Sequence, residues 1–187
     1  MKDLQELQKY YESNLCDRKF VYQLADGKTI QIVFYRESFC HLLGIQHVIG
    51  SKAYLGKAGY NRIQAGLVTI NHLKSMNRAG FAKISSRIKH FMCMGHLAQN
   101  GELFSFYPER VDGGTRIHAT HLVHEKSCQL YLHLFLAIES QKHNLCAPVS
   151  YIVLTERDDN PRLYIDGQIY KKVIKRSVLP MWQSPHP

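Results

Sequence analysis

The spacing of hydrophobic positions predicts helices through most of the first half of the chain. Hydrophobic residues recur at steps of three and four, the period of an amphipathic helix, over residues 3–15, 61–76 and 83–99. One or two helical turns are expected over residues 37–45, where Gly44 suits a helix end because glycine adopts positive φ angles without strain. Residues 46–58 are expected to form a loop.

Alternation of hydrophobic and polar residues predicts a β-hairpin near the N-terminus and a series of strands after residue 100. Phe20, Tyr22 and Leu24 alternate with polar residues, Asp26-Gly27 suits a tight turn, and the alternation resumes at Ile30. Further strands are expected at residues 103–107, 116–123, 129–138 and 149–155, with a last hairpin from residues 163–165 and 168–174 across Asp166-Gly167.

This order of elements favours the α+β class. Strands that follow one another in the sequence form antiparallel sheets with the helices segregated, whereas doubly wound folds alternate strand and helix. We expect residues 1–178 to form a single domain and residues 179–187, which contain three prolines, to form a tail that is ordered only if it docks.

The composition is that of an ordinary globular protein with no membrane partner. Of 187 residues, 45% are hydrophobic and 21% charged. The longest nearly apolar run, Leu130–Ile138, contains His133 and is far shorter than the roughly 20 residues that span a bilayer. The mixed-charge N-terminus predicts no signal peptide, and five cysteines without a Cys-x-x-Cys pair fit a reducing compartment. We therefore expect a cytoplasmic protein.

The distribution of charge points to a polyanionic partner. The formal net charge is +9, and residues 51–101 contain basic residues but no Asp or Glu. These basic residues are Lys52, Lys57, Arg62, Lys74, Arg78, Lys83, Arg87 and Lys89. A second cluster, at residues 171–176, includes Lys171 and Lys172. Nucleic acid is the commonest ligand of such surfaces, although a basic protein without such a partner is the alternative.

Several kinds of chemistry lack support in the sequence. There is no Gly-rich phosphate loop and no Gly-x-Ser-x-Gly nucleophile motif. His118, His121 and His124 are spaced for zinc on one helix face, but the segment is expected to be extended, so exposed or hydrogen-bonded histidines are the plainer interpretation. The single acidic run, residues 156–159, is typical of a solvated turn. We expect no metal and no other cofactor.

The residues present suit cleavage of RNA without a metal. The 2′-hydroxyl of RNA is an internal nucleophile, so a protein needs only to remove its proton, protonate the leaving 5′-oxygen and stabilise the charged phosphorane. Histidine transfers protons near neutral pH, and Arg and Lys stabilise negative charge. Ser, Tyr or Gln can position phosphate or base. Eleven histidines and an excess of cations supply these groups.

Five segments resemble, in order, the motifs of a phage-associated family in the barnase–EndoU–colicin–RelE nuclease-like superfamily. Residues 34–45 contain Phe39-Cys40-His41-Leu42-Leu43-Gly44, which resembles the F-x-H-L-x-G signature of that family. The other segments are Arg87-Ile88-Lys89-His90-Phe91, Leu134-Phe135-Leu136, Val149-Ser150-Tyr151-Ile152 and the closing Tyr164…Gln168…Val173-Ile174. The family more usually has two aromatic residues where this chain has Tyr151-Ile152.

The resemblance implies helices packed on a four-stranded antiparallel sheet and a metal-independent ribonuclease, often prophage-encoded or used as a toxin. Together with the strand pattern, it predicts that the N-terminal hairpin and helices pack against a mainly antiparallel sheet of four to five strands. The matched positions predict catalytic roles for His41, Arg87, Ser150 and Gln168 and nucleic-acid binding by Tyr164. Lys83, Lys89, Lys171 and Lys172 are expected to contact the nucleic acid.

Each position also has a structural interpretation. His41 could be a core histidine, Arg87 could anchor a carboxylate, and Ser150 could bond to a neighbouring strand. Tyr164 could be an ordinary strand residue, and Gln168 could cap a turn. His118 and His121 are further candidates for the acid or the base.

The sequence thus favours a phage or toxin endoribonuclease that acts on RNA such as tRNA or mRNA and is held in check by an antitoxin or immunity protein. The alternative is a non-catalytic phage protein that binds nucleic acid or inhibits a host-defence complex.

Overall fold

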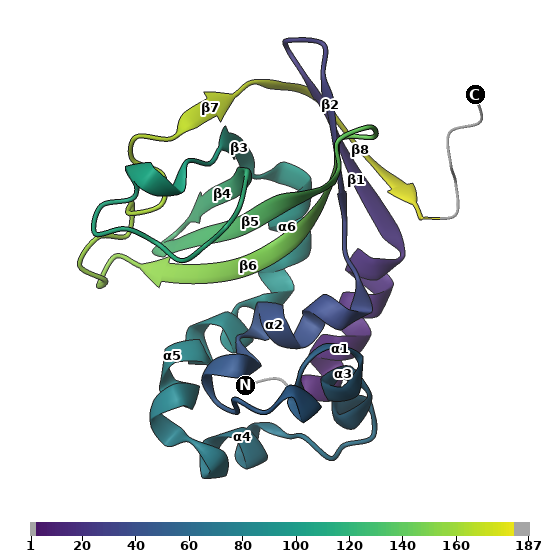
Figure 1. Ribbon diagram of the computed structural model, residues 1–187, viewed down its shortest axis with the longest axis vertical. Coiled ribbons are helices and arrows are strands. Elements are labelled where there is room, and N and C mark those ends of the chain that lie inside the picture. The colour runs from purple at the N-terminus through teal and green to yellow at the C-terminus, as the bar shows by residue number, and fades with distance from the viewer. Residues whose placement is uncertain (1–2, 182–187) are drawn as a thin grey trace.

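In the computed structural model, which describes residues 3–181, a helical layer packs beneath a curled eight-stranded sheet (Figure 1). The N-terminal helix α1 (Leu4–Tyr11) continues into one π-helical segment (Glu12–Cys16). The other helices of this layer are α2 (Phe39–Leu43), α3 (Gly56–Gln64), α4 (Ile70–Met76) and α5 (Arg78–Lys89). None of the described helices is long and apolar enough to cross a membrane.

The sheet is larger than the sequence predicted. Its strands are β1 (Arg18–Leu24), β2 (Thr29–Val33), β3 (Glu102–Ser105), β4 (His121–Ser127), β5 (Leu130–Ser140), β6 (Leu145–Thr155), β7 (Ile169–Lys171) and β8 (Val173–Pro180). They lie in the order β7-β3-β4-β5-β6-β2-β1-β8. The α+β class is confirmed, but the expectation of a four- to five-stranded sheet is wrong.

Two pairings explain the larger sheet. The predicted hairpin forms as β1 and β2 across Asp26-Gly27, but it joins the main sheet because β2 pairs in parallel with β6 at Gln31–Leu145 and Ile32–Cys146. At the other end of the chain, Lys172 alone separates β7, which pairs with β3, from β8, which pairs with β1. This one extended segment therefore supplies both edge strands of the sheet, β7 and β8.

Three further expectations about the strands need correction. Residues 163–165 lie in turns, so no final hairpin forms across Asp166-Gly167. The strand expected from Arg116 begins only at His121. Of the expected C-terminal tail, Leu179 and Pro180 belong to β8 and pair with Lys19 and Arg18, while residues 182–187 lie outside the described part of the chain.

Two long predicted helices are each divided in the structure. Gly66 has a φ of +71° and ends the first of them, and the Thr69 hydroxyl starts α4 by accepting a hydrogen bond from the His72 N–H. Leu67, whose spacing predicted burial, is therefore 62% exposed in the connection. The second helix stops at Lys89, and a 3₁₀ turn (Phe91–Cys93) leads into α6 (Met94–Asn100), which packs against β4, β5 and β8.

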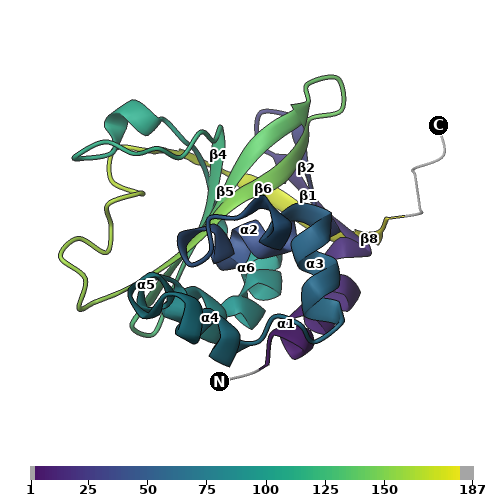
Figure 2. The same ribbon diagram turned by 60° about the horizontal axis from the view of Figure 1, so that its bottom comes forward.

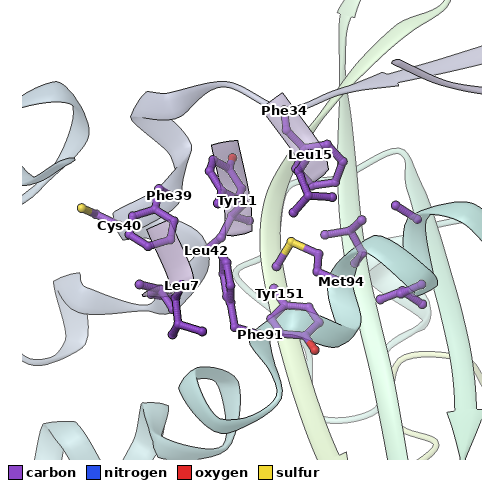
Figure 3. Packing of buried hydrophobic residues seen from close by; sticks show 14 of the residues in the cluster. Leu7, Tyr11, Leu15, Phe34, Phe39, Cys40, Leu42, Phe91, Met94 and Tyr151 are labelled. Carbon is purple, nitrogen blue, oxygen red and sulfur yellow. The ribbon is translucent and has the colours of Figure 1, made fainter. Parts of the chain in front are cut away.

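A cluster of aromatic rings joins the helical layer to the sheet (Figure 3). Phe91 packs edge-on against Phe39 of α2, with ring centroids 5.4 Å apart, and against Tyr151 of β6 at 6.3 Å. Tyr11 of α1 packs against both phenylalanines. The Tyr151 hydroxyl donates a 2.9 Å hydrogen bond to the His90 carbonyl, where α5 ends. These contacts set the distance between α2, α5 and β6.

A smaller core covers the opposite face of the sheet. Phe104, Leu122 and Phe135 pack there beneath residues 163–165. His124 and His133 lie among these residues as a cross-strand pair with ring centroids 4.9 Å apart. His133 is fully buried, and neither of its ring nitrogens has a hydrogen-bond partner in the described chain. Burial lowers the pKa of His133 to about 3 and that of His124 to about 4.

We predict that replacing Phe91 with Ala lowers the free energy of unfolding by about 3–5 kcal/mol, because it leaves a cavity between α2 and β6. Urea denaturation followed by circular dichroism measures the change. The exposed Leu67 is the matched control, and Leu67→Ala should change stability by less than about 0.5 kcal/mol. Equal effects of the two substitutions would contradict the assigned junction.

The histidine pair predicts a loss of stability in mild acid. Because the folded-state pKa of His133 lies below the unfolded value of about 6.5, the unfolded chain takes up a proton first as the pH falls. At pH 5 this costs about 2 kcal/mol relative to pH 7. The variant His133→Leu should therefore show a pH 5-to-7 stability difference smaller than that of the native chain by about this amount. An unchanged pH dependence would show that His133 already titrates normally.

Candidate nuclease site

A pocket of about 610 Å³ lies where α2 and α5 meet β6. It is lined by His41, Gln46, His47, Arg87, Thr115, Arg116, Ile117, His118, Val149, Ser150, Ile152 and Tyr164. Residues that are far apart in the sequence thus come together in four groups: α2 with the turn after it, α5, β6, and the loops that cover the second face. Figure 2 shows α2 and α5 beside β6. Five of the residues singled out from the sequence line this pocket: His41, Arg87, His118, Ser150 and Tyr164.

His41 is held at the surface by its own helix. In α2, Phe39, Leu42 and Leu43 are completely buried, whereas the His41 side chain lies on the opposite side of the helix and is exposed. A core role for His41 is therefore excluded. Its imidazole is accessible to a ligand in the pocket, as proton transfer requires.

Gly44 allows α2 and α5 to approach each other. It ends α2 with a φ of +83°, and the following 3₁₀ turn (Ile45–His47) carries His47 into the pocket. A Cβ atom at Gly44 would lie 2.8 Å from Ile84 Cγ2 and 3.2 Å from Arg87 Nη1. The glycine that ends the F-x-H-L-x-G motif thus allows His41, His47 and Arg87 to line the same pocket.

Arg87 is a half-buried cation without a protein counter-ion. Within residues 3–181, no carboxylate lies within ion-pair distance of its guanidinium. Burial lowers its pKa, an effect that the nearby Tyr164 and Tyr151 hydroxyls oppose, yet a guanidinium stays charged. The alternative that Arg87 anchors a carboxylate is therefore excluded for the described chain, and the charge is available to an anionic ligand.

The sheet and its covering loops supply the other walls of the pocket. Ser150 and Tyr151 are adjacent in β6, and Tyr151 enters the main core while Ser150 lines the pocket. Tyr164 belongs to the turn-rich segment after β6, where its ring packs edge-on against Phe135 at 5.2 Å and against His133 at 5.5 Å. Burial raises the pKa of Tyr164. Its hydroxyl is thus a neutral hydrogen-bonding group beside Arg87.

The lining of the pocket is cationic. It contains two arginines and three histidines but no Asp or Glu. The pKa of His47 is lowered by burial and then by the positive charges of Arg87, His41 and Lys83. His47 is therefore mainly neutral at pH 7, which leaves its imidazole free to accept a proton. Such a pocket can bind an anion and carry out proton transfer next to it.

Gln168 is separated from this group. Its side-chain Nε2 donates to the Tyr107 carbonyl at 3.2 Å, and its Oε1 accepts from the Tyr107 N–H at 2.7 Å. Both amide groups are thus used to tie two loops together. This arrangement resembles the turn-capping alternative more than a role in positioning substrate.

The predicted nucleic-acid-binding lysines fall in two places. Lys83 and Lys89 are exposed on α5, close to the pocket. Lys171 and Lys172 lie where β7 passes into β8, at the end of the sheet remote from α5 (Figure 1). Lys171 and His121 line a separate pocket of about 200 Å³ there. A ligand at Arg87 therefore has Lys83 and Lys89 as its nearest predicted partners.

The three regularly spaced histidines do not converge. His118 lines the pocket with Arg87, His121 faces the smaller pocket, and His124 is buried beside His133. No group of three His, Cys, Asp or Glu side chains suited to a metal ion occurs between residues 3 and 181.

Sequence reasoning missed His47, Gln46 and Arg116. They lie in segments expected to be a loop or a strand, and their patterns carry no periodic signal. The position of His47, three residues after the motif glycine, was the one available signal, because the turn that follows a helix-ending glycine stays close to that helix.

A comparison with protein families covers the segment that contains these residues. The model of the family described as phage-Barnase-EndoU-ColicinE5/D-RelE like nuclease 4 matches residues 3–177. The chain belongs to this family. The match extends from α1 into β8 and so includes every residue of the pocket. No match was found among the curated proteins or among the solved structures with which the chain was compared.

Membership in this nuclease family suggests that the substrate is a nucleic acid. It also confirms the resemblance carried by the F-x-H-L-x-G segment. In the structure, the motif histidine His41 lines the pocket, and the motif glycine Gly44 lets Arg87 lie close to it.

Gly44 provides a direct test of this geometry. Gly27 has the same φ of +83°, but a Cβ atom there would have no neighbour within 4 Å, so Gly27→Ala is a matched control for backbone strain alone. Each substitution should cost about 1–2 kcal/mol for the left-handed conformation. Gly44→Ala should cost about 1–3 kcal/mol more, because Ile84 and Arg87 must move. Urea denaturation measures both, and equal losses would contradict the close approach at Gly44.

Proposed function

We propose that this chain is a metal-independent endoribonuclease that cleaves RNA through attack of the 2′-hydroxyl at the pocket around Arg87. One observation carries the proposal: in the described chain, an unpaired half-buried arginine and three histidines line a single pocket without any carboxylate. A buried positive charge needs a partner, and a phosphodiester provides one. Membership of the nuclease family supports the same reaction class.

The histidines divide the two proton transfers between them. Neutral His47 accepts the proton of the 2′-hydroxyl, and the 2′-oxygen forms a bond to phosphorus. His41 in its protonated form donates a proton to the 5′-oxygen as the bond from phosphorus to that oxygen breaks. The products are a 2′,3′-cyclic phosphate and a 5′-hydroxyl. His118, which lies in the same pocket, is the alternative assignment for the acid.

The other side chains stabilise charge and position the substrate. The Arg87 guanidinium faces the phosphate, where it offsets the negative charge that builds up on the phosphorane. Ser150 and the Tyr164 hydroxyl can donate hydrogen bonds to phosphate or ribose, and the Tyr164 ring offers a surface for base stacking. Mg²⁺ prefers carboxylate ligands, which this lining does not supply, so the proton transfers fall to the imidazoles.

The rival function is non-catalytic binding of nucleic acid or inhibition of a host-defence complex. It is favoured by the exposed cations of α4 and α5, such as Lys74, Arg78 and Lys83, which attract a polyanion whatever the state of His41. A toxin role, with an antitoxin or immunity protein that covers the cationic pocket, is a further part of the nuclease proposal.

We expect the purified protein to cleave labelled RNA in EDTA and to leave fragments that end in 2′,3′-cyclic phosphate. His41→Ala should lower kcat about 10²–10⁴-fold, the range for loss of a general acid or base. His143, an exposed histidine in the turn between β5 and β6, is the matched control, and His143→Ala should keep the native rate. Single-turnover gel assays on tRNA and on unstructured RNA provide the measurement.

Binding with intact RNA at stoichiometric enzyme would favour the rival function. In that case Arg87→Ala should weaken binding and His41→Ala should not, because only the nuclease reaction needs the imidazole as an acid. Equal losses of activity in His41→Ala and His143→Ala would refute the assignment of His41.

A further inference from the structure

A second pocket, of about 880 Å³, lies at the end of β6 next to α5. Its lining includes Ser86, Lys89 and His90 from α5, Gln129 from the turn between β4 and β5, and Thr155 and Arg157 at the end of β6. Lys89 is the one residue of this lining that the sequence predicted to contact nucleic acid, and the family match assigns no role to the pocket.

Both pockets lie between the same two elements. Arg87 of α5 and Ser150 of β6 line the first pocket, and Ser86 and Thr155 of those elements line the second. In Figure 1, β6 ends above α5. The five residue-to-residue steps from Ser150 to Thr155 span about 16 Å at the rise of a β-strand. The two pockets therefore form one track along α5 and β6, which we call the α5–β6 track.

The second pocket is also cationic. Lys89 and Arg157 are exposed, and neither forms an ion pair with a carboxylate of the described chain. Burial and the charge of Lys89 lower the pKa of His90. Glu156 is the single acidic residue of the lining, and Lys126 lies 3.4 Å from its carboxylate. The net field in this pocket therefore favours an anion, as in the first.

One edge of β6 runs along the track without a neighbouring strand in the described chain. Residues 147–155 pair with β5 on one side, whereas pairing with β2 stops at Cys146. The second edge of this stretch, within residues 3–181, faces α2 and α5 rather than another strand. The side chains of Ser150 and Thr155 point to opposite faces of β6, so the track follows this edge of the strand rather than one face of the sheet.

We infer that the α5–β6 track binds a single RNA strand of about five nucleotides, at the stacked rise of about 3.4 Å per nucleotide. The phosphate to be cleaved lies at Arg87, and the flanking phosphates lie at Lys89 and Arg157. The substrate is a single strand, because α5 on one side and the β4–β5 turn on the other bound the second pocket. The placement of the cleaved phosphate at Arg87 rests on the proposed nuclease function. The binding of a single strand along the track does not.

Binding to a strand that cannot be cleaved tests the track apart from catalysis. The probe is a fluorescent 2′-O-methyl oligonucleotide of eight residues, which has no 2′-hydroxyl nucleophile. In Lys89→Ala/Arg157→Ala, the dissociation constant should rise at least tenfold, and the slope of log K against log salt should shrink by about 1.4, because each single-strand phosphate contact contributes about 0.7.

The matched control is Lys52→Ala/Lys57→Ala, which removes the same charge from exposed positions outside both pockets. It should raise the dissociation constant less than threefold, and both double variants should keep the native urea midpoint because all four side chains are exposed. Equal weakening by the two double variants, or tighter binding of the matching duplex than of the single strand, would overturn the α5–β6 track.

Cleavage assays separate this inference from the proposed function. If the native protein cleaves RNA, kcat/KM for an octanucleotide relative to a dinucleotide should fall about tenfold in Lys89→Ala/Arg157→Ala. If the native protein cleaves no RNA but the binding results hold, the nuclease mechanism is refuted and the track stands. The third outcome is that the native protein cleaves RNA but Lys89→Ala/Arg157→Ala changes neither binding nor the preference for longer substrates. This result would refute the track, and the proposed nuclease function would stand.

Discussion

The structure depends on the packing of Phe91 between Phe39 and Tyr151. These three rings belong to the core, yet each is close in sequence to a residue of the candidate site: His41 follows Phe39 by two positions, Arg87 precedes Phe91 by four, and Ser150 precedes Tyr151. Edge-on aromatic contacts and the hydrogen bond from Tyr151 to the His90 carbonyl hold α2, α5 and β6 at a set spacing. The positions of the polar groups therefore follow from hydrophobic packing, which is what makes a preorganised site possible in a protein of this size.

The second constraint is electrostatic. The chain places its carboxylates away from the region between α2 and α5, so Arg87 is half-buried without a counter-ion in the described chain. Burial, and after it the same positive charges, lower the pKa of His47 and keep that imidazole mainly neutral at pH 7. An unpaired buried charge and a neutral base in one pocket are unfavourable for folding alone but suit a phosphodiester substrate. The two pockets on α5 and β6 extend this field over the length of several nucleotides.

Local patterns were most informative where a single element decides the outcome. The hairpin around Asp26-Gly27, the helix that ends at Gly44 and the strand that contains Ser150 all form where alternation, periodicity and glycine predicted them. The pattern failed where neighbouring elements decide. Leu67 fits a helical face but is exposed because Gly66 ends α3, and residues 163–165 are strand-like but fold into turns that cover His133. The strand count was too low because the extra pairings join segments far apart in the sequence. The β2–β6 pairs are more than 100 residues apart, the β3–β7 pairs about 65 and the β1–β8 pairs about 150–160.

The sequence by itself determined the residue types of the chemistry: an acid-free basic stretch over residues 51–101, the histidine and glycine of the F-x-H-L-x-G motif, and the ordered segments that place the chain in its nuclease family. The tertiary structure alone decided which of them meet. It joined His41, Arg87, His118, Ser150 and Tyr164, added Gln46, His47 and Arg116, and used the Gln168 amide to tie two loops together. The physical reason is that periodicity records which side of its own element a residue faces, whereas the position of that element against the others is set by long-range packing of rings such as Phe91 and Tyr151.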